Sequence, residues 1–285
     1  MKLCQAKGLI MIQNQKRSVF LISDGTGITV ESFANSVLSQ FPDFEFQYHA
    51  YPYTDSIKKI ESICDKINTN FEFNHTEPLI FLTMVHADMI KPLLNTPCHI
   101  FDFLNPMIDS LENILKSKSL DQAGRAHGFL SSKRYDQRID AINYALNCDD
   151  GLGPQNYEKA DIILIGVSRC GKTPSCLYMA LQFGIYAANY PITEESIDAQ
   201  YLPQTLKAHK NKLFGLTISP QRLHHIRSER RPNSSYATLS QCQYEVSTVE
   251  SLYQQQKIPF LDSTHYSIEE ISTRIMSQMH VKRRL

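Results

Sequence analysis

The sequence has no excess of charge of either sign, and it has no long apolar run. Lysine plus arginine total 29, as do aspartate plus glutamate, so the formal net charge is zero. A balanced chain has no general attraction for nucleic acid or an anionic membrane, so any basic site must be local. The apolar stretch Leu9–Ile12 is too short for a signal segment or a membrane span. We therefore expect neither nucleic acid nor a membrane as a partner.

Paired cysteines and internal repeats are also missing. The seven cysteines are scattered with no C-x-x-C pair, which argues against a zinc site and against a thioredoxin-type motif. Their odd number, with no secretion signal before them, favours reduced thiols and a cytoplasmic location. A chain of 285 residues is long enough for one large domain or two of ordinary size.

Strand and helix patterns alternate along the chain, which predicts an α/β fold with parallel sheets covered by helices. The run Pro78–Val85 is typical of a strand buried on both faces. Residues 149–154 (DDGLGP) predict a turn and a domain boundary near residue 155. We expect a loose leader over 1–17, a Rossmann-like parallel-sheet lobe over 18–155, and a P-loop nucleotide-kinase-like lobe over 156–285.

The clearest motif is GVSRCGKT at residues 166–173, which fits G-x-x-x-x-G-K-[ST] at every fixed position. It lies between an apolar strand (Asp161–Val167) and an amphipathic helix (Lys172–Phe183), which disfavours the alternative of a glycine-rich turn that binds nothing. Backbone N–H groups of such a loop, with the helix amino terminus, hold phosphate oxygens. The predicted nucleotide-binding residues are Gly166, Val167, Ser168, Arg169, Cys170, Gly171, Lys172 and Thr173.

Within this loop, we expect Lys172 to contact the terminal phosphates and the Thr173 hydroxyl to hold Mg²⁺. Arg169 either reaches a phosphate or faces solvent, and the sequence does not decide between these. Cys170, at a helix amino terminus, could have a lowered pKa. We favour the simpler interpretation that Cys170 is a small side chain that fits.

Missing motifs exclude two other classes of nucleotide-binding protein, the GTPases and proteins of the protein-kinase fold. The only Asn-Lys pair, Asn211-Lys212, is not followed by the aspartate of a guanine-reading N-K-x-D, and the HRD and DFG motifs of protein kinases are absent. Nucleotide kinases close an arginine-bearing lid over the phosphates. Residues 221–236 suit a lid, with Arg227 and Arg230 as candidates to stabilise the transferring group; a solvated helix face is the alternative.

Two further features are less specific. Asp262 follows a short apolar strand, where it could hold Mg²⁺ or accept a hydroxyl proton, but a plain turn aspartate is equally compatible. The segment SDGTG at residues 23–27 lacks the third glycine of a dinucleotide fingerprint, because Val30 stands there. It is either a tight turn, which we favour, or an anion site.

Several segments together resemble the pyruvate, phosphate/water dikinase regulatory protein family. They are SDGTG at 23–27, the Asp149-Asp150-Gly151 turn, GVSRCGKTP at 166–174, AANYP at 187–191, LFGLTI at 213–218, the arginine segment and STHYSIEEI at 263–271. The resemblance covers nearly the whole chain from about residue 18. Two departures are Cys170, where serine is usual, and Cys148, where histidine is usual.

The resemblance implies a bifunctional enzyme. It implies phosphorylation of a target threonine in phosphoenolpyruvate synthase with ADP as donor, which inactivates the target. It also implies removal of that phosphate by inorganic phosphate, releasing pyrophosphate, with Mg²⁺ expected. The amino-terminal lobe is then a candidate for docking the protein partner. An ATP-dependent small-molecule kinase and a nucleotide-sensing module are the alternatives, and the sequence leaves open the catalytic base, the target threonine and whether the chain forms a homo-oligomer.

Overall fold

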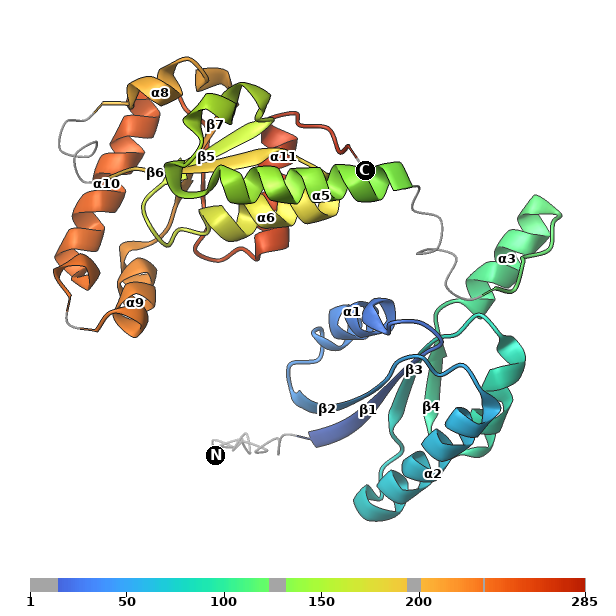
Figure 1. Ribbon diagram of the computed structural model, residues 1–285. Helices are drawn as coiled ribbons and strands as arrows, with labels where there is room; N and C mark the ends of the chain where they lie inside the picture. The colour runs from blue at the N-terminus through green and yellow to red at the C-terminus, as the bar shows by residue number, and fades with distance from the viewer. Residues whose placement is uncertain (1–14, 123–131, 194–200, 233, 285) are drawn as a thin grey trace, which may run out of the picture. The chain divides into compact units, whose positions relative to one another are not determined.

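The computed structural model describes residues 15–122, 132–193, 201–232 and 234–284 (Figure 1). It contains two four-stranded parallel sheets covered by helices, as the alternating pattern predicts. The chain divides into two compact units between residues 129 and 130. Among the described residues, no helix is both long and apolar enough to cross a membrane.

The amino-terminal unit contains a sheet of strand order β2-β1-β3-β4. Alternate residues of β1 point to opposite faces: Val19 and Leu21 pack with α1, while Phe20 and Ile22 pack with α2 and η1. This explains why residues 19–22 of β1 and 79–82 of β3 are all apolar, since both faces of the sheet are covered there. The elements are β1 (Gln15–Ser23), α1 (Ile28–Leu38), β2 (Phe44–Tyr51), α2 (Ile57–Asn74), β3 (Leu79–Thr83), η1 (Ala87–Asn95), β4 (His99–Asp102) and α3 (Asn105–Leu115).

The carboxy-terminal unit contains a second sheet, of strand order β6-β5-β7-β8. Its strands are β5 (Ile162–Gly166), β6 (Ala187–Pro191), β7 (Leu213–Thr217) and β8 (Phe260–Asp262). The chain leaves β5 toward β6 on one side and returns to β7 on the other, so the strand order reverses at β5. Ligands of open parallel sheets bind outside the carboxyl ends of the strands at such a point. The segment that follows β5 is therefore the expected ligand position.

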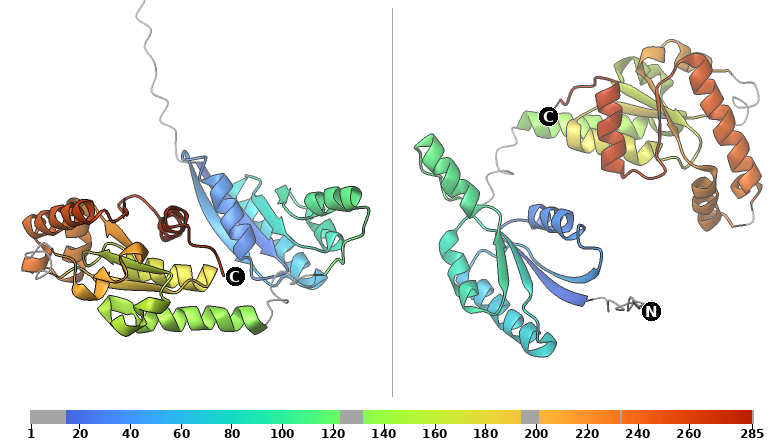
Figure 2. Two further views of the ribbon diagram at one scale, coloured as in Figure 1. Left: turned by 90° about the horizontal axis from the view of Figure 1, so that it is seen from above. Right: turned by 180° about the vertical axis from the view of Figure 1, so that it is seen from behind.

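Helices and short 3₁₀ segments surround this second sheet (Figure 2). They are α5 (Ser132–Asn147), η2 (Asp149–Gly151), η3 (Pro154–Lys159), α6 (Lys172–Phe183), α8 (Gln204–Lys207), η4 (Lys210–Lys212), α9 (Pro220–Arg230), η5 (Ser235–Ala237), α10 (Leu239–Gln256) and α11 (Ile268–Gln278). Gly184 ends α6 in the left-handed conformation, and Ser267 with Glu270 forms a capping box at α11. Both of these ends agree with the sequence.

The unit boundary lies earlier than residue 155, where the turn signals placed it. Helix α5 belongs to the carboxy-terminal unit because Ala141 and Ala145 pack against Ala180 of α6, so that the two helices lie side by side (Figure 1). Of the expected leader over 1–17, residues 1–14 lie outside the described residues, and β1 begins at Gln15.

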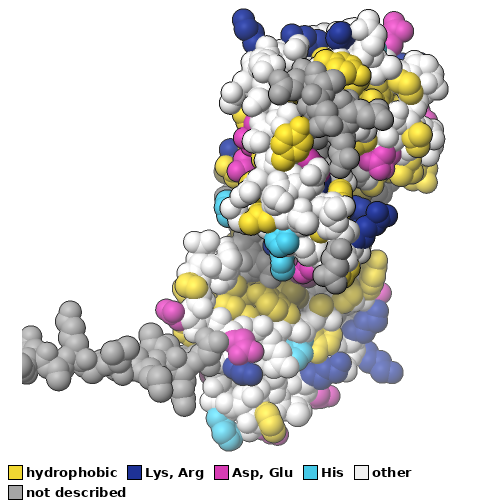
Figure 3. All heavy atoms as spheres, turned by 90° about the vertical axis from the view of Figure 1, so that its left-hand side faces the viewer, with side chains coloured by type: hydrophobic (Ala, Val, Ile, Leu, Met, Phe, Trp, Pro, Cys, Tyr) yellow, Lys and Arg dark blue, Asp and Glu magenta, His cyan; other side chains and the backbone are white. Residues whose placement is uncertain are grey.

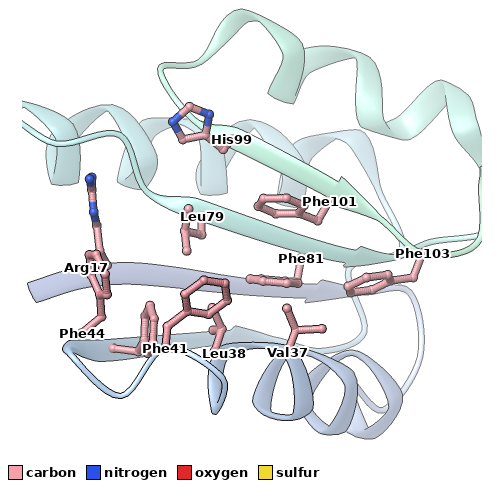
Figure 4. Close-up of a pocket in the computed structure, with 11 residues that line it drawn as sticks. Arg17, Val37, Leu38, Phe41, Phe44, Leu79, Phe81, His99, Phe101 and Phe103 are labelled. Carbon is pink, nitrogen blue, oxygen red and sulfur yellow. The ribbon is translucent and has the colours of Figure 1, made fainter.

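Charged side chains of both signs are interspersed on the face drawn in Figure 3, in keeping with the balanced composition. The amino-terminal unit also contains an apolar groove of about 380 Å³ between the end of α1 and the sheet. Its lining includes the rings of Phe41, Phe44, Phe81, Phe101 and Phe103 (Figure 4). Arg17 and His99 are the ionisable residues that the described part of the chain contributes to this mainly aromatic and aliphatic lining.

Candidate active site

The loop between β5 and α6 has the backbone that its glycines predict. Gly166 has φ 156° and Gly171 has φ 97°, values that side chains rarely allow. A Cβ on Gly166 would also collide with the carbonyl oxygen of Leu216 and would lie 2.9 Å from the Cys170 sulfur. Arg169 adopts φ 80° without being glycine. The sheet therefore constrains the loop at Gly166, whereas at Gly171 the constraint is the positive φ alone.

Three donors hold carbonyl oxygens of this loop. The Lys172 ammonium donates to the Val167 carbonyl at 2.9 Å, and Arg227 donates to the Ser168 carbonyl at 3.1 Å. The Ser263 hydroxyl lies 2.9 Å from both the Cys170 and the Thr217 carbonyl oxygens and can donate its single proton to either. With these negative ends engaged, the loop repels an incoming phosphate less than free carbonyl groups would.

The Asp149-Asp150-Gly151 turn folds against the start of α6. The Thr173 hydroxyl donates to the Asp149 carboxylate at 2.9 Å, and the Asn189 amide donates both to that carboxylate and to Thr173. The Asp150 N–H in turn donates to the Asn189 side-chain oxygen at 3.0 Å. A segment that the sequence indicated as a domain boundary is therefore part of the site.

A cavity of about 240 Å³, here called the P-loop cavity, lies over the loop. Its lining residues are Asp150, Ser168, Arg169, Gly171, Lys172, Thr173 and Pro174. Asp150 is the one acidic residue in this lining, and its carboxylate has no hydrogen-bond partner among the described residues. Its backbone is left-handed, with φ 48°, which is uncommon for aspartate. The cavity thus combines a cation, a hydroxyl and a carboxylate.

A second cavity of about 220 Å³, here called the arginine cavity, lies beside the first. Its lining residues are Ser168, Arg169, Arg227, Arg230, Arg231 and Tyr236, so the two cavities share Ser168 and Arg169. Arg169 is exposed and lines both. The predicted lid segment thus places Arg230 near the loop, whereas Arg222 is exposed and lines neither cavity.

Arg227 differs from the other arginines of α9 because its side chain is fully buried, so the solvated-face alternative is wrong for it. Its guanidinium makes two hydrogen bonds with the Glu245 carboxylate, at 2.7 and 3.0 Å, and it also donates to the Tyr236 carbonyl at 3.0 Å. Burial lowers the pKa of Arg227, but the hydrogen bond and charge of Glu245 more than offset this and raise it above its ordinary value. Arg227 therefore supports the loop through Ser168, and its predicted direct contact with the transferring group stays a prediction.

Two other predicted residues lie apart from the P-loop cavity. Asp262, at the end of β8, accepts a hydrogen bond from the Thr264 N–H at 2.9 Å and lines a different hollow with Ser219 and Glu250. Its predicted roles in proton transfer and Mg²⁺ binding gain no support from this position. Cys170 is buried, and burial raises the pKa of its thiol, in line with the simpler interpretation of that residue.

The SDGTG turn of the amino-terminal unit is accounted for by local contacts. The Ser23 hydroxyl accepts from the Gly25 N–H at 3.1 Å, and the Asp24 carboxylate accepts from the Val85 N–H at 2.7 Å. Gly27 has φ 81° at the start of α1. These contacts fit the tight-turn interpretation, because Ser23 and Asp24 stabilise the turn and connect it to the residue after β3.

Comparisons with known proteins show which proteins this chain is similar to. A family model described as Kinase/pyrophosphorylase matches residues 19–276. A Legionella pneumophila (strain Corby) protein named "Putative phosphoenolpyruvate synthase regulatory protein" is 51% identical over 270 residues, covering 95% of this chain and 100% of the relative. Proteins of the same name from Hahella chejuensis and Pseudomonas fluorescens (strain Pf-5) are each 47% identical, covering 95% and 94% of this chain and 99% of each relative.

Proposed function

The chain belongs to the kinase/pyrophosphorylase family, and from this premise we propose that it is a bifunctional regulator of phosphoenolpyruvate synthase. In one direction it transfers the β-phosphoryl group of ADP to a threonine of the synthase and inactivates it. In the other direction orthophosphate removes that group as pyrophosphate and restores the synthase. The observation that carries the proposal is that Lys172, Thr173 and Asp150 line one cavity over a glycine-rich loop.

Each residue of the P-loop cavity has a part in this reaction. The loop backbone and Lys172 hold the phosphates of ADP, or the orthophosphate that takes their place in reverse. Asp150 accepts the proton of the threonine hydroxyl as its oxygen attacks the β-phosphorus, and it returns a proton when that bond breaks. ADP as donor is the part of the proposal that rests on the family resemblance, since the same loop would hold a terminal diphosphate of ATP.

The residues near Thr173 also suit Mg²⁺. Mg²⁺ prefers oxygen ligands, and in phosphoryl-transfer sites it uses one or two protein groups together with substrate phosphates. Thr173 lines the cavity, the Asp149 carboxylate lies 2.9 Å from its hydroxyl, and both offer such oxygens. When bound, Mg²⁺ would neutralise part of the phosphate charge.

The donor experiment tests the proposal directly. We expect the purified protein to label a threonine of phosphoenolpyruvate synthase from β-labelled ADP, and subsequent orthophosphate to release that label as pyrophosphate. Label arriving only from γ-labelled ATP would contradict the ADP part. Rapid turnover of ATP with a metabolite, and no protein labelling, would favour a small-molecule kinase; tight ADP binding without transfer would favour a sensing module.

Replacing Asp150 tests its role as the base. Asp150→Asn keeps the size of the side chain but removes its ability to accept a proton, so we expect both directions to slow by about 10²-fold or more. The measurement is the single-turnover rate with saturating ADP and synthase, alongside ADP affinity, which we expect to stay within a few-fold. Asp140→Asn is the control, because Asp140 is exposed on α5 and lies outside the cavity lining. A rate near that of the unmodified protein would remove Asp150 from the mechanism.

A further inference from the structure

The arginine cavity carries positive charge that the loop itself does not use. The charge of Arg227 is balanced by Glu245, at 2.7 Å. Arg169, Arg230 and Arg231 have no carboxylate within ion-pair distance anywhere in the described part of the chain. Three unpaired guanidinium groups around one small cavity favour an anion with more than one charge, and their planar shape suits phosphate oxygens.

The walls of this cavity are fixed by the buried ion pair beneath it. Arg227 connects α9 to α10 through Glu245, to η5 through the Tyr236 carbonyl, and to the loop through the Ser168 carbonyl. Its guanidinium also stacks on the Tyr236 ring, with 3.9 Å between the guanidinium carbon and the ring centre. The cavity is thus built before any ligand arrives, which lowers the entropy cost of binding one.

The position of the arginine cavity indicates which anion it takes. It shares Ser168 and Arg169 with the P-loop cavity, so phosphate groups in the two cavities would be neighbours with Arg169 between them. The P-loop cavity, with Lys172 and Asp150, holds the donor side. The arginine cavity is then on the side of the target threonine, which accepts the phosphoryl group from ADP. In the reverse reaction that threonine carries the phosphate, so the anion in the arginine cavity is a phosphate ester.

Building on the proposed function, we propose that the arginine cavity binds the phosphate of phosphothreonine in the modified protein substrate. Orthophosphate in the P-loop cavity then attacks that phosphorus. Orthophosphate gives its proton to Asp150 as the new phosphorus–oxygen bond forms to give pyrophosphate. The bond to the threonine oxygen breaks, and that oxygen takes the proton from Asp150. Unmodified threonine has no charge for Arg230 and Arg231 to hold, so these two residues distinguish the phosphorylated substrate from the unmodified one.

The kinetic test is the double variant Arg230→Gln/Arg231→Gln. Both side chains are exposed, so the variant should fold. We expect the KM for phosphorylated synthase to rise by about tenfold or more, because two charge-assisted contacts are lost. We expect the KM values for unmodified synthase and ADP to stay within about twofold, since neither uses these contacts. Arg222→Gln is the matched control on the same helix, exposed and outside both cavities. Equal losses in both directions, or no loss in either, would overturn the inference.

A binding test separates this inference from the proposed function. O-phospho-L-threonine should bind the protein without substitutions and the Lys172→Ala variant, and it should bind the double arginine variant more weakly. Orthophosphate should bind the double arginine variant normally and the Lys172→Ala variant more weakly. If the protein without substitutions transfers no phosphate but shows this binding pattern, the proposed function is wrong and the phosphothreonine site in the arginine cavity is supported. If both ligands depend only on Lys172, the arginine cavity is not a phosphothreonine site.

Discussion

Lys172→Ala should abolish phosphoryl transfer in both directions, with rates lower by about 10³-fold or more. The Lys172 side chain is buried over the loop, with its ammonium at the Val167 carbonyl and its side chain lining the P-loop cavity. Among the described residues of this lining, Lys172 and Arg169 are the cations that can stabilise charge on the transferring group, and of the two only Lys172 is buried. Because ADP and orthophosphate use the same loop in the proposed cycle, one substitution removes both activities. The measurement is threonine labelling from ADP and pyrophosphate release from the phosphorylated synthase.

The control for this variant is Lys207→Ala, which removes an exposed lysine from α8 in the same unit. We expect it to keep both activities. Thermal unfolding should show that Lys172→Ala is folded, because Lys172 has no carboxylate partner among the described ion pairs and its removal leaves no opposite charge buried. If Lys172→Ala loses one direction and keeps the other, the two reactions use separate sites.

Glu245→Gln should lower the free energy of unfolding by about 3–5 kcal/mol, the range for breaking a buried ion pair. The side chains of Arg227 and Glu245 are 0% and 6% exposed, so the remaining guanidinium charge would have neither its carboxylate nor water. Arg227 also donates to the Ser168 carbonyl of the loop. Because loss of Glu245 would release Arg227, the folded fraction of the variant should bind ADP more weakly. The measurement is urea unfolding of the two proteins at one pH.

Two comparisons make this experiment specific. Glu229→Gln, on the same helix as Arg227, breaks an exposed pair with His225 and should change stability by less than about 1 kcal/mol. Replacing both partners, as Arg227→Met/Glu245→Leu, removes both buried charges and should recover much of the stability while the loop support is still lost. A loss from Glu245→Gln no larger than that from Glu229→Gln would show that the pair contributes little.

The sequence predicted the features that depend on neighbouring residues. The apolar run of β5, the glycines at 166 and 171, and the helix that begins at Lys172 are contiguous, so motif and context identify the loop together. The capping box of α11 and the glycine end of α6 are likewise local. Such features need only backbone geometry and hydrogen bonds within a few residues.

Features that depend on distant contacts could not be predicted. Asp150 reaches the P-loop cavity because Asn189, 39 residues later, holds its N–H, and the sequence of the turn indicates only a chain reversal. Arg227 can be buried because Glu245 on α10 pairs with it. Glu245 is 18 residues away in the sequence, on a helix whose polar sequence gives little periodic signal. For Asp150, the one local hint in the sequence was the pair of adjacent aspartates before Gly151. Strand β6, with the sequence AANYP, lacks the branched residues that mark most strands.

Cys170 gives the site a property that concerns oxidants. Peroxide attacks the thiolate form of cysteine, and a sulfenic acid inside a phosphate-binding loop would add bulk and polarity beneath the backbone. The Cys170 side chain is 1% exposed, so peroxide has little access to it. Burial also raises the pKa of its thiol, so little of it is in the thiolate form. The enzyme should therefore keep its activity under oxidative stress that inactivates phosphate-transfer enzymes with an exposed, acidic cysteine.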